Sequence, residues 1–167
     1  MDLEHLLGQK LLFAFHGKET LSPEIIEAFQ KYHPSGISLF RSLNIGTLAQ
    51  VRELNDSLQR LARDLDLPLL FIATDQEGGQ LMAIGDGTPL PGNMALGATR
   101  SAELARKAGE VLGREMSALG FNVNYAPCAD VNINPQNPVV GVRSFGEDPH
   151  LVAELTAAMI EGMQSQG

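Results

Sequence analysis

Two acidic residues, Asp75 and Glu77, stand where a buried strand is predicted to end, in the segment DQEGG that follows the apolar run 69–74. Paired carboxylates in such a place are typical of general acid and base chemistry, as in the hydrolysis of glycosidic bonds. The alternative is structural: one carboxylate caps backbone N–H groups of the turn at Gly78 and Gly79, and the other is solvated. Their spacing leaves both interpretations open.

A long loop at residues 134–150 carries a single arginine among small and apolar residues. Long structured loops often carry function. The guanidinium of Arg143 could bind a carboxylate or a hydroxyl group, or it could pair with Glu147 or Asp148 and fix the loop. The sequence around Arg143 does not separate these two roles.

A third carboxylate, Asp130, lies in the last predicted strand, residues 122–132. In a parallel α/β fold the ligand site lies at the carboxyl ends of the strands. Because Asp75 and Glu77 follow the preceding strand, we expect all three carboxylates at one rim of the sheet.

The elements that must position these residues alternate along the chain. Short apolar runs predict strands at residues 11–15, 36–40, 69–74 and 122–132. Helical periodicity and capping signals predict helices at residues 22–33, 47–64 and 101–120, and from about Pro149 onward, after a short helical leader at 3–10.

This alternation predicts a parallel sheet with right-handed crossovers. The sheet is either an open doubly wound sheet or part of a (β/α)8 barrel. A whole barrel typically needs about 250 residues. The 167 residues would then supply roughly half a barrel. No Pro-, Gly- or Ser-rich linker divides the chain, so we expect one domain over residues 1–167 and no second domain.

The composition argues against several other classes. A formal net charge of −8 without a basic cluster argues against nucleic-acid binding, and no apolar run suggests a membrane span. The four histidines and the single cysteine, Cys128, lack the spacing of metal ligands, so neither a metal nor another cofactor is expected. A lone cysteine fits a reducing compartment, and the first ten residues lack the profile of a secretory signal, so the cytoplasm is the expected location.

Three segments carry a more specific signal: DQEGGQL, then TPLPGNMALGAT, then the run from LGREMSALGF through NYAPCADVN to RSFGEDP. Together they resemble the N-terminal domain of glycoside hydrolase family 3, especially its branch of NagZ-like β-N-acetylhexosaminidases. The resemblance is collinear and covers essentially the whole chain. It implies an α/β fold that is the N-terminal part, about four βα units, of a TIM-type (β/α)8 barrel, and retaining hydrolysis of β-linked sugars without a metal.

The same resemblance implies roles for individual residues. Asp75 would hold hydroxyl groups of the sugar in the −1 subsite, and Arg143 would bind the same sugar. Asp130 would line the site or have a structural role. Glu77 then falls back to a structural role. In the family, the segment KHFPGHG comes after those quoted and supplies further substrate-binding residues. A loop beyond it carries the acid/base pair, and the nucleophile comes later still. We therefore expect no catalytic residue in this chain and no hydrolysis by it alone, because a retaining mechanism needs both groups.

The expected ligand is a β-linked sugar, either an N-acetylglucosaminide or a glucoside. A β-glucosidase of the same family and a non-catalytic sugar-binding or assembly module are the alternatives. Where relatives often have DQEGGRVxR, this chain has Gln80 and Ala83 in place of two arginines, which removes two expected contacts to an anionic or peptide-bearing sugar. Half a barrel also leaves strand edges and an apolar face unpaired, so we expect self-association through them or poor solubility.

Overall fold

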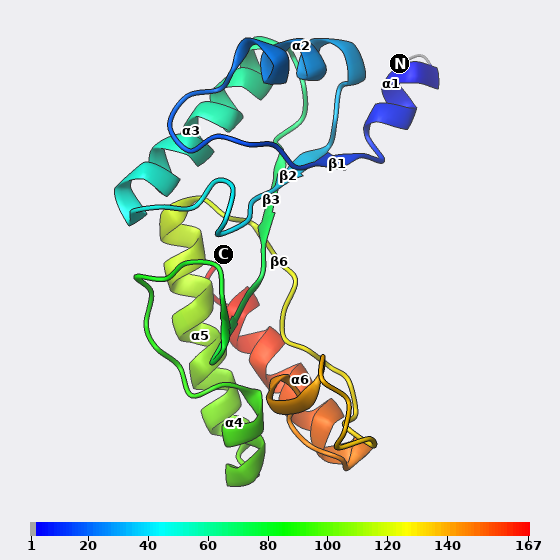
Figure 1. The fold of residues 1–167 in the computed structure, drawn as a ribbon, viewed down its shortest axis with the longest axis vertical. Coiled ribbons are helices and arrows are strands. Elements are labelled where there is room, and N and C mark those ends of the chain that lie inside the picture. Colours follow the sequence, from blue (N-terminus) through cyan, green and yellow to red (C-terminus); the bar gives the residue numbers. More distant parts are fainter. Residues whose placement is uncertain (1–2) are drawn as a thin grey trace. The chain divides into compact units, whose positions relative to one another are not determined.

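The structure, a computed structural model, describes residues 3–167, which form two compact units (Figure 1). The first unit holds the described residues up to Thr74 together with residues 118–124. The second unit holds residues 75–117 and 125–167. The boundary at Thr74 falls directly before the DQEGG segment, so the carboxylates of that segment belong to the second unit.

A parallel sheet forms the core of the first unit. Its strands, in spatial order, are β1 (Leu12–Phe13), β2 (Gly36–Ser38), β3 (Phe71–Thr74) and β6 (Val123–Asn124). Each neighbouring pair is parallel. In chain order each of these strands is followed by helical structure, so the predicted strand–helix alternation is confirmed.

Three helices belong to the first unit: α1 (Leu3–Gly8), α2 (Pro23–Tyr32) and α3 (Leu48–Asp64). The Oγ1 atom of Thr47 accepts a hydrogen bond from Gln50 N at 3.2 Å and so caps the start of α3. Val51, Leu54 and Leu58 recur at three- and four-residue steps along α3 and are fully buried. The helix predicted over residues 47–64 is confirmed to within one residue.

The second unit begins with an antiparallel hairpin of β4 (Gln76–Gly78) and β5 (Leu81–Met82). Its helical segments are α4 (Asn93–Thr99), α5 (Ala102–Leu119, whose last two residues fall in the first unit), the 3-10 turn η1 (Gly141–Arg143) and α6 (Pro149–Gln164). The hairpin turn needs positive φ angles, 82° at Gly78 and 61° at Gly79, which glycine adopts without strain. Periodicity does not predict this hairpin, because its strands span three and two residues.

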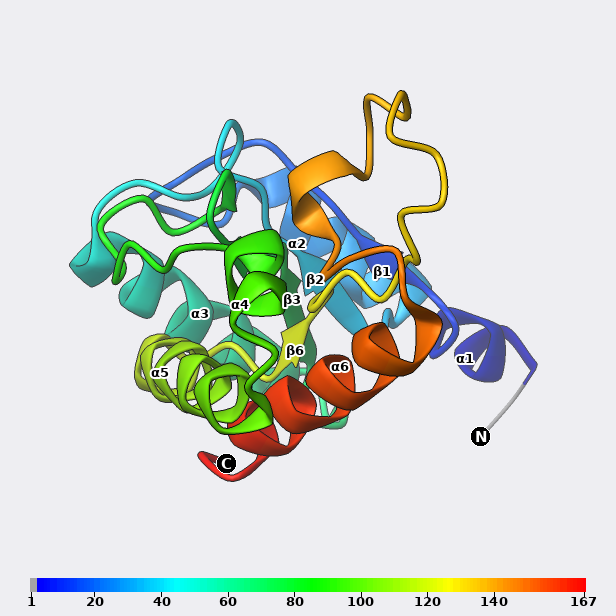
Figure 2. The same cartoon turned by 90° about the horizontal axis from the view of Figure 1, so that it is seen from below.

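Helices α5 and α6 pack against each other with their backbones in contact (Figure 2). Gly109 and Gly113 of α5 face the backbone of α6, and Gly162 of α6 faces the backbone of α5 at Arg106. A Cβ atom at any of the three glycines would crowd the facing backbone. Phe145, in the loop before α6, is buried in the same apolar cluster as both helices. This packing fixes the loop that carries the candidate arginine.

The strand predicted over residues 122–132 is wrong beyond β6. Pro127 has no N–H group to donate to a sheet ladder. Further along, Asn132 N donates to Gly146 O at 2.9 Å, so the backbone of this segment bonds to the following loop. The chain therefore leaves the sheet earlier than its apolar pattern predicts.

Among residues 3–167, no helix combines the length and the apolar character that crossing a membrane requires. A single domain over residues 1–167 stays a prediction.

Candidate active site

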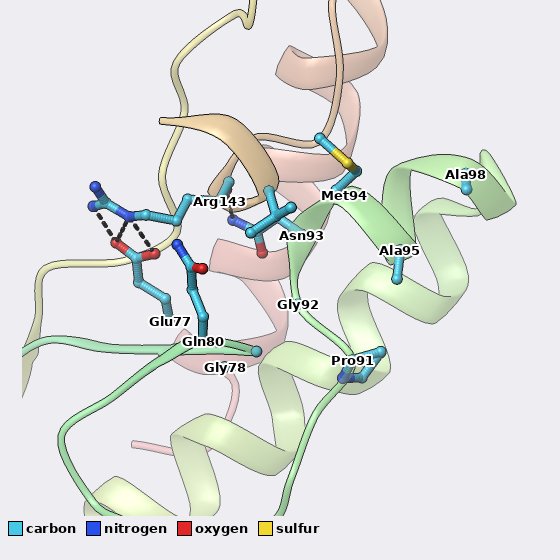
Figure 3. Close-up of a pocket in the computed structure, with 12 residues that line it drawn as sticks. Glu77, Gly78, Gln80, Pro91, Gly92, Asn93, Met94, Ala95, Ala98 and Arg143 are labelled. Carbon is cyan, nitrogen blue, oxygen red and sulfur yellow. Dashed lines mark hydrogen bonds and ion pairs between the residues drawn. The ribbon is translucent and has the colours of Figure 1, made fainter. Parts of the chain in front are cut away.

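The candidate site is organised around an ion pair between Glu77 and Arg143 (Figure 3). Arg143 Nε donates to both carboxylate oxygens of Glu77, at 3.1 Å to Oε1 and 2.9 Å to Oε2, and Nη2 donates to Oε1 at 2.5 Å. The side chain of Glu77 is 3% exposed and that of Arg143 is 26% exposed. Contact through two nitrogens fixes the plane of the guanidinium as well as its position.

Local structure holds both partners in place. Glu77 is the middle residue of β4, all of which is buried. Arg143 ends η1, and its backbone carbonyl accepts a hydrogen bond from Asn93 Nδ2 of α4 at 2.7 Å. Its Nη1 donates to Val139 O at 3.2 Å, within a turn where Asn137 Oδ1 accepts from Val139 N at 2.8 Å. The arginine is thus anchored at both its backbone and its side chain.

The carboxylate of Glu77 raises the pKa of Arg143 above its ordinary value, chiefly through their hydrogen bonds and against the opposing effect of burial. The described contacts of the guanidinium use three of its five N–H donors, two toward Glu77 and one toward Val139. Two N–H groups on the terminal nitrogens are left for a ligand by these contacts. A rigid pair of N–H donors suits two neighbouring oxygen atoms, such as adjacent hydroxyl groups of a sugar.

The structure brings Asp130 into the electrostatic surroundings of Arg143. Asp130 is exposed, and its charge adds to the upward shift in the pKa of Arg143. Its Oδ2 atom accepts a hydrogen bond from Cys128 Sγ at 3.1 Å, and its backbone carbonyl accepts from Ser144 Oγ at 2.6 Å. Ser144 is fully buried and follows the arginine directly, so it ties the two segments together.

Asp75 directly precedes β4 and is half-buried. Its backbone carbonyl accepts a hydrogen bond from Ala83 N at 3.1 Å, across the hairpin. Both carboxylate oxygens of Glu77 face Arg143, so Glu77 holds an arginine and is not placed for acid or base chemistry on a substrate. The hypothesis of an acid/base pair therefore loses one of its members, while the sugar-binding role of Asp75 stays a prediction.

The partner of Arg143 lies 66 residues away in the sequence. It is Glu77 rather than the nearby Glu147 or Asp148. Asp148 instead caps α6, where its Oδ1 accepts a hydrogen bond from His150 N at 2.9 Å. Glu77 has a structural role, as one of the two interpretations predicts. Its contact, however, is Arg143 rather than the N–H groups of the glycine turn. Local spacing could not find this pair, since neither segment is near the other in the chain.

Two supporting residues, Asn93 and Ser144, are missed by reasoning from the sequence. Both are buried and both bond to the backbone around Arg143 or Asp130. Their only signal is that they lie inside the motifs LPGNMALGAT and RSFG. Within residues 3–167, no group of three or more His, Cys, Asp and Glu side chains could hold a metal ion. The arrangement that remains, one fixed guanidinium with carboxylates around it, suits a neutral ligand rich in hydroxyl groups.

Comparison with known proteins identifies the protein family of this chain. Residues 5–167 match the glycosyl hydrolase family 3 N terminal domain, and the chain belongs to this family. Over its whole length it is 38% identical to the beta-hexosaminidase A of Pseudoalteromonas piscicida. Over 59% of its length it is 40% identical to a beta-N-acetylglucosaminidase/beta-glucosidase of Cellulomonas fimi, of which the match covers 17%. A solved family 3 beta-N-acetylglucosaminidase from Paenibacillus sp. str. FPU-7 superposes on 99% of the chain with a TM-score of 0.94 and 42% identity.

The chain spans 31% of the length of the beta-hexosaminidase A and 31% of the Paenibacillus enzyme. The predicted fold class is confirmed: the chain is an α/β protein that forms the N-terminal part, about four βα units, of the barrel domain of this family.

Proposed function

We propose that this chain supplies the sugar-holding part of a retaining β-N-acetylhexosaminidase. The observation that carries the proposal is the buried Glu77–Arg143 pair, which fixes an arginine and leaves two of its N–H groups for oxygen atoms of a ligand. The hexosaminidase relatives named above support the choice of an N-acetylglucosaminide.

In this proposal Arg143 donates to two hydroxyl oxygens of the sugar at the non-reducing end. Asp75 accepts hydrogen bonds from hydroxyl groups of the same sugar, and Asp130 lines the site beside them. Glu77 does not touch the sugar but positions Arg143. A carboxylate and a guanidinium together recognise hydroxyl groups well, because one accepts and the other donates.

The chain alone is proposed not to hydrolyse glycosides. A retaining mechanism needs a nucleophile and an acid/base about 5 Å apart across the scissile bond. Both carboxylate oxygens of Glu77 already accept hydrogen bonds from Arg143, so Glu77 is proposed to fill neither role. The test measures turnover of a chromogenic β-N-acetylglucosaminide by the purified 167-residue chain. Turnover at the level of buffer is expected, and turnover clearly above buffer would contradict this part of the proposal.

A second candidate is β-glucosidase activity, favoured by the Cellulomonas relative whose name carries both activities. A full-length protein that contains this chain should be assayed with matched chromogenic glycosides, one an N-acetylglucosaminide and one a glucoside. The primary proposal expects the first to be cleaved with the higher kcat/KM. A higher kcat/KM for the glucoside would contradict the primary proposal and support β-glucosidase activity instead.

A non-catalytic sugar-binding or assembly role stays the third possibility, and absence of turnover of either glycoside by the full-length protein would favour it. The cytoplasm likewise stays a proposal for the location, supported by the lone thiol of Cys128.

A further inference from the structure

Residues 83–90, which we call the strap, lead from β5 toward α4 and bond to the start and end of the DQEGG segment. At the first end of the strap, Ala83 N donates a hydrogen bond to Asp75 O at 3.1 Å. At its other end, Leu90 O accepts a hydrogen bond from Gly79 N at 3.0 Å. Asp75 and Gly79 flank β4 on its two sides. The strap is therefore tied to the stretch of chain that carries both acidic residues of DQEGG.

The middle of the strap is tied to helix α5 by Glu115. Both carboxylate oxygens of Glu115 accept a hydrogen bond from Thr88 N, at 3.0 Å and 3.2 Å, and Oε1 also accepts one from Thr88 Oγ1. Hydrogen bonds to a carboxylate are roughly twice as strong as those between neutral groups. Thr88 begins the motif TPLPGNMALGAT and Glu115 lies in LGREMSALGF, so this contact joins two segments that the sequence shows only as separate motifs.

Gln76 and Gly87 connect the strap to β4. Gln76 is fully buried, and its Oε1 accepts a hydrogen bond from Ile84 N at 2.9 Å. Gly87 lies between two side chains: a Cβ atom there would lie 2.9 Å from Glu115 Oε2 and 3.4 Å from Gln76 Nε2. Because successive side chains of a strand point to opposite faces, Gln76 points away from the two acidic residues that flank it. The strap thus supports β4 from the side opposite to those acidic residues.

We propose that Glu115 is a positioning residue for the sugar-holding segment: through Thr88 and the strap, it sets where Asp75 and Glu77 lie. The inference rests on the proposed function, because it concerns how that same site is held. Without the carboxylate of Glu115, the strap keeps its bonds to the DQEGG segment but loses its attachment to α5. The segment then gains freedom to move, and a site that must be ordered when its ligand binds has a lower affinity.

The first test measures the affinity of the folded chain for N-acetylglucosamine by NMR titration. Glu115→Met keeps the length of the side chain but removes both oxygens, and it should weaken binding about five- to tenfold. Glu115→Gln keeps one oxygen that can accept from Thr88, so it should recover most of the affinity. The matched control is Glu110→Met, since Glu110 is also a half-buried residue of α5 but pairs with Arg106 of the same helix. It should bind the sugar like the wild type.

Amide hydrogen exchange gives a second readout that needs no sugar. The amides of Ala83 and Gly79, which bond across the two ends of the strap, should exchange about tenfold faster in Glu115→Met relative to the amides of α6 in the same protein. Glu110→Met should leave this ratio unchanged. Comparison within one protein removes the effect of a general loss of stability.

An unchanged exchange ratio in Glu115→Met, or wild-type sugar affinity in that variant, would overturn the inference and leave the proposed function intact. Equal effects of Glu115→Met and Glu110→Met would overturn it as well. If the folded wild type binds no sugar, the proposed function fails, and the exchange ratio alone then decides whether Glu115 positions the segment.

Discussion

Replacing Glu77 with glutamine isolates the contribution of its charge, because the side chain keeps its size and shape. The carboxylate is 3% exposed and its partner Arg143 is 26% exposed, so the pair is largely but not completely removed from water. Loss of the charge leaves the guanidinium with a neutral acceptor and without its counter-ion. The expected loss of stability is about 2–3 kcal/mol, below the roughly 3–5 kcal/mol typical of a fully buried pair, since water still reaches Arg143.

A matched control is available at another ion pair with the same N–O distance. Glu53 and Arg60 of α3 approach to 2.5 Å, as Glu77 and Arg143 do, but the side chains are 66% and 49% exposed. Glu53→Gln should therefore cost less than about 0.5 kcal/mol. The two substitutions then differ in burial and in the hydrogen bonds from the arginine, three to Glu77 and one to Glu53.

The assay is urea unfolding followed by circular dichroism, with sugar binding measured on the same preparations. Glu77→Gln should also weaken the binding of N-acetylglucosamine by about tenfold, because the guanidinium is no longer held in one plane. Glu53→Gln should bind the sugar like the wild type. Equal stability losses in the two variants would refute the argument from burial, and unchanged sugar binding by Glu77→Gln would refute its positioning role.

Three further predictions follow from packing, burial and exposed surface. Gly162→Ala should destabilise the protein by about 2–3 kcal/mol in thermal or urea unfolding, because the new methyl group overlaps the backbone of α5 at Arg106. Burial raises the pKa of the Cys128 thiol, so the folded protein keeps this proton at pH values where the unfolded chain, near its ordinary pKa of 9.0, has released it. Its contribution to stability should be complete below that pH and decline as pH rises above it, which unfolding at pH 8 and pH 10 measures. The 167-residue chain should self-associate in sedimentation through exposed apolar side chains such as Leu69 and Phe71, 72% and 54% exposed, and Leu69→Asp should reduce this association.

Each of these three predictions has its own control and a result that would contradict it. Ala157→Ser on the exposed side of α6 should leave stability within about 0.5 kcal/mol, and an equally mild Gly162→Ala would show that the two helices can move apart. Cys128→Ala should remove the part of the alkaline destabilisation that comes from the thiol, so an unchanged pH profile would assign that effect elsewhere. A monomeric wild-type chain with a cooperative melt would contradict the prediction of self-association.

The main elements of the fold could be predicted because they depend on local patterns. The capping signal at Thr47 and the buried positions of α3 lie close together in the sequence, so they predict the bounds of α3 to within one residue. The hairpin β4–β5 could not be found in this way, because its two short strands carry too few residues to show a period. The last predicted strand is too long because its apolar pattern continues to residue 132, whereas the sheet pairing ends at Asn124.

In the candidate site, too, local sequence patterns predict the positions of residues but not their contacts with distant parts of the chain. The positions of Asp75, Asp130 and Arg143 at strand ends and in a long loop could be predicted from motifs. The pairing of Arg143 with Glu77 joins segments 66 residues apart, and only the packing of the second unit brings them together. The local sequence therefore suggests catalysis or the capping of a turn for Glu77, whereas its contact in the structure is Arg143.

Binding of a sugar by Arg143, held in place by Glu77, can be measured by titrating the folded, 15N-labelled chain with N-acetylglucosamine in NMR experiments. We expect saturable shifts at the backbone amides of Asp75, Glu77 and Arg143, and their loss in Arg143→Met. A folded chain whose amides do not respond to the sugar, or respond equally in Arg143→Met, would contradict this expectation.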